Sequence, residues 1–121
     1  MSELTRVDVI KLIAIANKKL NLSGVDLSNI DLNGLDLCGA NLSYTNFTKA
    51  NLENAGLTGA DLFGANLTFA DLSFCNLVGA DLTKAILEGA DLTGANLKLV
   101  KGYNKWLQRE RYKLRILRGC Y

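Results

Sequence analysis

Seven aspartates lie between residues 26 and 91, and the spacings between them are all multiples of five residues. Acid–base catalysis uses such carboxylates in pairs, and an apolar pocket must raise the pKa of the one that donates a proton. A strict period, however, assigns every one of these aspartates to the same outward position of a repeating unit. We therefore expect the carboxylates to line an outer wall, and we expect no carboxylate-pair catalysis.

Other side chains with catalytic potential are absent or poorly placed. The chain has no histidine, which removes the imidazole base, the imidazole metal ligand and every triad that contains one. Its glycines match no phosphate-binding loop. Cys75 takes an apolar position of the repeat, whereas Cys38 and Cys120 have no identified group that would activate a thiol. We expect no enzyme activity, cofactor, metal site or small-molecule substrate.

The composition also predicts a location. Three scattered cysteines make no disulfide framework, so a reducing cytoplasm is expected. No run of about 18 apolar residues is present to cross a membrane. The N-terminal stretch MSELTRVDVIKLIAIANKKL carries acidic residues and lacks the basic leader of a signal peptide. The predicted localisation is therefore cytoplasmic.

The chain from residue 20 to residue 99 divides into sixteen consecutive pentapeptides, whose positions we number from first to fifth. The first position is Ala in ten pentapeptides, and the third is Leu in all except one, which has Phe47. The second position is Asp or Asn in fourteen, the fourth is Ser or Thr in nine, and the fifth is Gly in eight. Such a sustained internal period is the signature of a repeat architecture.

Apolar residues at the first and third positions are separated alternately by two and three residues. On an α-helix such steps spread residues around the whole circumference, and on a flat strand they alternate between faces. The pattern fits a solenoid in which both residues point inward along a short side and the chain then turns at Gly, Asp, Asn, Ser or Thr. The predicted core comprises the third-position residues: Leu22, Leu27, Leu32, Leu37, Leu42, Phe47, Leu52, Leu57, Leu62, Leu67, Leu72, Leu77, Leu82, Leu87, Leu92 and Leu97.

The motif A-(D/N)-L-x-x, as in ADLFG (60–64), ANLTF (65–69) and ADLTG (90–94), resembles that of the pentapeptide-repeat protein family. The resemblance covers 80 of 121 residues. It implies an all-β solenoid, a right-handed quadrilateral parallel β-helix of about four coils over residues 20–99. One terminal coil would then carry the four bulky first-position residues, as expected where a coil meets a cap: Leu20, Val25, Ile30 and Leu35.

A stacked solenoid needs a cap at its N-terminal end. Residues 1–19 are expected to form a capping helix, with Ser2 or Thr5 as the N-cap and Lys18 and Lys19 in the last turn. A β-strand over KLIAIA is the alternative, because the segment is rich in β-branched residues.

The C-terminal segment 100–121 is basic, with seven Lys or Arg residues and one acid, whereas residues 20–99 carry three lysines and nine acids. We expect this segment to be a capping helix or a tail. It could also contact an anionic membrane or nucleic acid. The candidate contact residues are Lys105, Arg109, Arg111, Lys113 and Arg115.

Four aromatic residues take outward positions that the repeat does not reserve for them. Phe63, Phe69 and Phe74 fall in the third predicted coil, and Tyr44 lies one coil away, above Gly64. They are candidates for a partner or self-association surface. The alternative is that large side chains only cover corners and shield the backbone.

These features favour a non-catalytic interaction or scaffold protein with an unknown protein partner. The family that the chain resembles is abundant in cyanobacteria, so a bacterial source is expected. The same resemblance implies an alternative, a DNA-mimicking regulator of an enzyme such as gyrase. Four coils, however, would span about 19 Å, or roughly six base pairs, and the flanking segments are basic.

Overall fold

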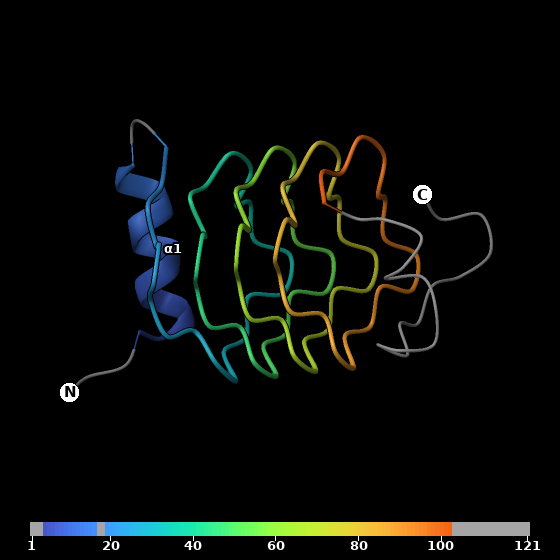
Figure 1. Ribbon diagram of the computed structural model, residues 1–121. Helices are drawn as coiled ribbons and strands as arrows, with labels where there is room; N and C mark the ends of the chain where they lie inside the picture. The colour runs from blue at the N-terminus through green and yellow to red at the C-terminus, as the bar shows by residue number, and fades with distance from the viewer. Residues whose placement is uncertain (1–3, 17–18, 103–121) are drawn as a thin grey trace.

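The computed structural model describes residues 4–16 and 19–102. The helix α1 (Arg6–Ile15) precedes a stack of coils and lies across its N-terminal end (Figure 1). In the part of the chain that is described, no helix is long and apolar enough to cross a membrane.

The coils are joined by parallel β-bridges between residues 20 positions apart. Thirteen isolated bridges connect second-position residues of consecutive coils, from Asn21 with Asn41 to Asp81 with Lys101. Over residues 4–16 and 19–102 the pairing produces no longer strand, because a corner follows each short side. One turn of this ladder therefore takes four pentapeptides.

Each turn has four sides, which we number from residue 20. Side 1 contains 20–24, 40–44, 60–64 and 80–84, and side 2 contains 25–29, 45–49, 65–69 and 85–89. Side 3 contains 30–34, 50–54, 70–74 and 90–94, and side 4 contains 35–39, 55–59, 75–79 and 95–99. A residue thus lies beside the residues 20 positions before and after it, as Figure 1 shows for the stacked coils.

The interior is a single apolar column. All sixteen third-position residues are buried, and Phe47 is fully so. First-position alanines fill the remaining space. Where Thr45 replaces alanine, its hydroxyl donates a hydrogen bond of 2.8 Å to the carbonyl of Leu22, so this buried polar group is satisfied.

The polar repeat residues build the corners. At the second position the Oδ1 atom of Asp or Asn accepts a hydrogen bond from the N–H two residues on, as between Asp81 and Thr83 at 2.9 Å. The Thr83 hydroxyl and then this N–H hold the pKa of Asp81 below its ordinary value. Fifth-position residues have positive φ, which is the reason for the frequent glycine.

Helix α1 begins as the sequence suggests and ends earlier than expected. Thr5 is the N-cap, and it forms a reciprocal capping box with Asp8. The segment KLIAIA contributes to the helix, not to a strand. The prediction of lysines in the last turn is wrong: the helix ends at Ile15, and Ala16 is already extended, which allows the chain to enter the first coil.

One face of α1 packs on the open end of the core. Val9 is fully buried and belongs to the same apolar cluster as the solenoid interior, with Leu12 and Ile13 packed against it. Leu20 and Val25 of the first coil are only partly buried and also contact this cluster. The bulky first-position residues therefore lie at the end of the column that faces the helix.

At the other end the ladder extends two residues beyond the last whole pentapeptide. Lys101 pairs with Asp81, and Gly102 lies against the backbone of Thr83. Residues 103–121 lie outside the described residues. The predicted C-terminal cap or tail, including its five candidate basic residues, therefore stays a prediction.

Candidate interaction surface

Three exposed aromatic residues occupy corners where glycine would be the unstrained choice. Tyr44, Phe69 and Phe74 have φ values of 57°, 57° and 59°, in the left-handed region. Such a conformation costs a residue with a Cβ atom about 1–2 kcal/mol. Their side chains nevertheless remain 62%, 59% and 55% exposed. The turn does not require these rings, and burial does not explain them.

Each of these rings lies over a glycine of the following coil. A Cβ atom built on that glycine would come within 2.7 Å or less of the ring in all three cases. The pairs are Tyr44 over Gly64, Phe69 over Gly89 and Phe74 over Gly94. The glycine therefore makes room for the ring, which covers the wall with one face and exposes much of the other.

The structure brings two of the four candidate aromatics together. The rings of Tyr44 and Phe63 meet edge to face, with centroids 5.7 Å apart, and the Nζ atom of Lys84 lies 5.8 Å from the Phe63 centroid. Phe63 is half-buried, whereas Tyr44 is exposed. We call these three residues the aromatic corner. It spans three consecutive coils at the end of side 1 and combines apolar area with a cation.

Phe69 and Phe74 do not join this cluster. They occupy the fifth positions of sides 2 and 3, which are the next two corners of the coil that contains Phe63. Within residues 4–16 and 19–102, no ring contact links them to each other or to Tyr44. Proximity in the sequence thus placed them on one coil, but the four-sided winding separates them around its perimeter.

Lys84 is a member of the site that sequence reasoning missed. The signal was available, because Lys84 takes the fifth position two coils after Tyr44 and therefore lies in the same corner column. The repeat register alone places it beside these aromatics.

The thiols of Cys75 and Cys38 and the carboxylate of Asp26 are not poised for nucleophilic or acid catalysis. Burial raises the pKa of Cys75 to about 12, and burial also raises that of Cys38. The Ser28 hydroxyl and N–H lower the pKa of Asp26, so it is ionised at neutral pH. The region that the structure describes has no group of three possible metal ligands.

A glycine substitution can test whether the rings fill space that a side chain would need. Gly79 and Gly89 both have φ of 70°, but a Cβ at Gly79 meets nothing within 4 Å, whereas at Gly89 it meets the Phe69 ring at 2.4 Å. We expect Gly79→Ala to lower the free energy of unfolding by about 1–2 kcal/mol. Gly89→Ala should cost roughly 1 kcal/mol more, because Phe69 must leave its rotamer.

Urea denaturation of both variants, repeated in a Phe69→Gly background, measures this difference. The extra cost of Gly89→Ala should disappear in that background. An unchanged extra cost without the ring would contradict the assigned contact.

Comparison with known proteins agrees with this geometry. The family model described as pentapeptide repeats matches residues 21–59 and 60–98. Among solved structures, the pentapeptide repeat protein Rfr23 from the cyanobacterium Cyanothece 51142 is 33% identical, with a TM-score of 0.69. The alignment covers 88% of this chain and 66% of that one, so this chain spans slightly less than two thirds of the relative's length.

Two further solved structures are similar over different shares of their length. A pentapeptide repeat protein from the Arabidopsis thaliana thylakoid lumen is 36% identical, over 70% of this chain and 61% of that chain, with a TM-score of 0.37. The protein alr5209 from Nostoc PCC 7120 is 25% identical, over 97% and 99%, with a TM-score of 0.48. No curated protein matches the chain.

Proposed function

Because the chain belongs to the pentapeptide-repeat family, whose fold is a right-handed β-helical solenoid, we propose that it is a non-catalytic module that binds another protein through its outward side chains. The proposed unit is a scaffold of four coils between an N-terminal helical cap and the C-terminal segment. We place it in the cytoplasm, where its described cysteines, Cys38 and Cys75, would stay free thiols.

The observation that carries this proposal is the aromatic corner. Tyr44 holds a strained backbone conformation and still exposes 62% of its surface, although eight of the sixteen pentapeptides have glycine at this fifth position. Exposed aromatic residues are side chains that protein interfaces concentrate at their centres.

The corner offers a partner two kinds of contact. The free face of the Tyr44 ring can pack against an apolar side chain, and Lys84 can pair with an acidic group or with the negative face of an aromatic ring. A partner that makes both contacts must align with three coils at once. The ladder of parallel β-bridges already holds these coils in register, which reduces the ordering cost in the module itself.

Affinity capture from cells that express the protein tests the proposal. The full chain serves as bait, and the Tyr44→Ser variant is compared with Val7→Ser, which removes a similarly exposed apolar group from α1. We expect Tyr44→Ser to reduce recovery of a specific partner by about tenfold, corresponding to roughly 1.4 kcal/mol, and Val7→Ser to leave it unchanged.

Retained capture by Tyr44→Ser would reject the aromatic corner as the binding site. Mass analysis of the captured material also reports self-association, which would appear as a second copy of the chain. Equal losses in both variants would indicate a nonspecific apolar effect and would count against the proposal.

A further inference from the structure

The first coil has a free backbone edge, because no coil precedes it. Within the stack, the carbonyls of second- and fourth-position residues accept hydrogen bonds from the coil before them. Gly56 and Thr58 accept in this way from Leu37 and Gly39, both at 2.8 Å. The equivalent carbonyls of the first coil face α1 and have no coil to donate to them.

Arg6 shows what chemistry this edge accepts. Its Nη1 atom donates to the carbonyl of Asp31 at 3.1 Å and lies 3.4 Å from the Asp31 carboxylate. Its Nη2 atom donates to the carbonyl of Asn33 at 2.9 Å. One planar guanidinium therefore contacts the second- and fourth-position carbonyls of side 3 together with the side-chain carboxylate of Asp31.

Side 4 of the same coil presents an equivalent set of acceptors. Cys38 N–H donates to Asp36 Oδ1 at 3.0 Å, as Asn33 N–H donates to Asp31 Oδ1 at 2.9 Å. The next coil pairs with the two sides at matching distances of 2.8–2.9 Å. Among the described residues, none donates a hydrogen bond to the carbonyl of Asp36 or Cys38.

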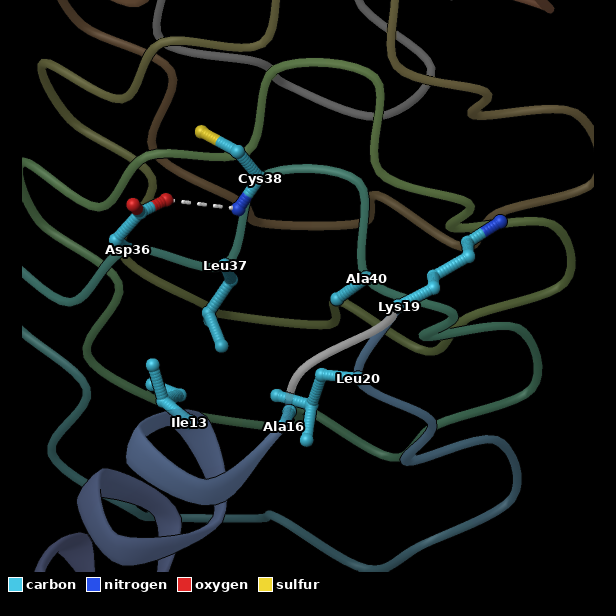
Figure 2. Close-up of a pocket in the computed structure, with 8 residues that line it drawn as sticks. All are labelled: Ile13, Ala16, Lys19, Leu20, Asp36, Leu37, Cys38 and Ala40. Carbon is cyan, nitrogen blue, oxygen red and sulfur yellow. Dashed lines mark hydrogen bonds between the residues drawn. The ribbon is translucent and has the colours of Figure 1, made fainter.

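A pocket of about 180 Å³ opens beside this second set (Figure 2). Ile13 of α1, Leu20 and Leu37 supply apolar lining, and Asp36 and Lys19 stand at its sides. Figure 2 shows the Lys19 ammonium directed away from Asp36. The pocket thus joins two carbonyls that accept no hydrogen bond from a described residue to an apolar surface that could cover the methylene groups of a ligand.

We propose that this pocket binds a guanidinium group of a second molecule, held by the carbonyls of Asp36 and Cys38 and by the Asp36 carboxylate. The guanidinium would repeat on side 4 the contacts that Arg6 makes on side 3. The aliphatic part of the ligand that carries it would lie against Ile13 and Leu37. The site is separate from the aromatic corner, so it stands or falls independently of the proposed protein partner.

The ionisation of the site suits a cation at neutral pH. The Cys38 thiol and N–H lower the pKa of Asp36, so its carboxylate is charged, while Cys38 itself stays a neutral thiol because its pKa is raised mainly by burial. Of the described residues that line the pocket, Lys19 is the one that carries a positive charge, and its ammonium group is directed away from Asp36.

Titration of the ¹⁵N-labelled full chain with L-argininamide tests the proposal by NMR. We expect saturable shifts of the Asp36 and Cys38 amides, with a dissociation constant on the order of 1 mM, as for a small ligand with few contacts. L-citrullinamide, which has the same α-amino group but an uncharged urea in place of the guanidinium, should give none. A blocked tripeptide with a central arginine distinguishes an arginine within a protein, which should bind at least as well, from a free small molecule.

Variants supply the matched controls. Asp36→Asn should weaken binding at least about fivefold, or roughly 1 kcal/mol, and should fold normally because Asn41 occupies the same position of its own pentapeptide. Asp26→Asn should leave binding unchanged: Asp26 makes the same turn with Ser28 on side 2 but does not line the pocket.

Three results would overturn the proposal. The first is no saturable shift up to about 20 mM ligand, well above the expected dissociation constant. The second is an equal response at Asp26 and Ser28, which would show unspecific attraction to acids. The third is binding that appears only after Lys19→Ala, which would make Lys19 the natural occupant of these acceptors.

Discussion

Replacing Phe47 by alanine is expected to lower the free energy of unfolding by about 3–5 kcal/mol. Phe47 is fully buried and is the largest side chain of the core column. On side 2 it stacks between Leu27 of the preceding coil and Leu67 of the following coil. A β-helix packs each layer directly on the next, so neither neighbour can move into the cavity without breaking its own ladder bonds.

Phe47→Leu is the matched control for this prediction. Leucine occupies the third position in all of the remaining fifteen pentapeptides, so the backbone at residue 47 accommodates it without a change of register. We expect a loss of less than about 1.5 kcal/mol. Urea denaturation followed by far-ultraviolet circular dichroism measures both variants. Equal losses of stability in Phe47→Ala and Phe47→Leu would mean that this position requires an aromatic ring, and would contradict a core in which all third positions are equivalent.

Two adjacent residues of similar chemistry should respond very differently to truncation. Leu87 is fully buried at a third position, whereas its neighbour Ile86 takes a second position on the outer wall and is 45% exposed. We expect Leu87→Ala to lower the free energy of unfolding by about 2–5 kcal/mol. Ile86→Ala should change it by about 0.5 kcal/mol or less, as is usual for a surface substitution.

This pair tests the division of the repeat into inner and outer positions. Both variants keep the pentapeptide length and the backbone bond between Ile86 N–H and the Ala65 carbonyl. Their difference in urea midpoint therefore reports side-chain direction alone. A loss at Ile86 as large as that at Leu87 would contradict the assignment of second positions to the outer wall.

The interior of this protein was predictable because the period is strict. An interval of five residues, with apolar residues two and three apart, leaves one arrangement in which Leu67 and Ala65 both point inward. The structure places both in the buried column. The same period assigned the aspartates to the wall, where Asp26 and Asp81 complete turns with the residues two positions on.

The contacts between segments were not predictable in the same way. Arg6 reaches Asp31 and Asn33 across 25 and 27 residues, and no period relates a helix to the edge of a coil. The early end of α1 also follows from tertiary structure, since Ala16 is already extended ahead of the first coil, where the carbonyl of Leu20 accepts from the N–H of Asn41. Sequence signals described the helix start at Thr5 better than its end.

The aromatic residues show both the use and the limit of the repeat register. It places Tyr44, Gly64 and Lys84 in one corner column, so their proximity could be derived. It does not fix side-chain torsions, and therefore it could not show that Tyr44 lies on Gly64 and meets Phe63 edge to face. Sequence proximity alone also grouped Phe69 and Phe74 too closely with this pair.

The central claim is that the aromatic corner serves binding rather than folding, and one variant tests it when both properties are measured. For Tyr44→Ser we expect a free energy of unfolding within about 1 kcal/mol of the native value, because serine keeps the Cβ atom and the same backbone strain and the ring that is lost is 62% exposed. Partner capture should fall about tenfold in the same preparation. A loss of more than about 2 kcal/mol in stability with undiminished capture would contradict the claim and make the ring a structural cover.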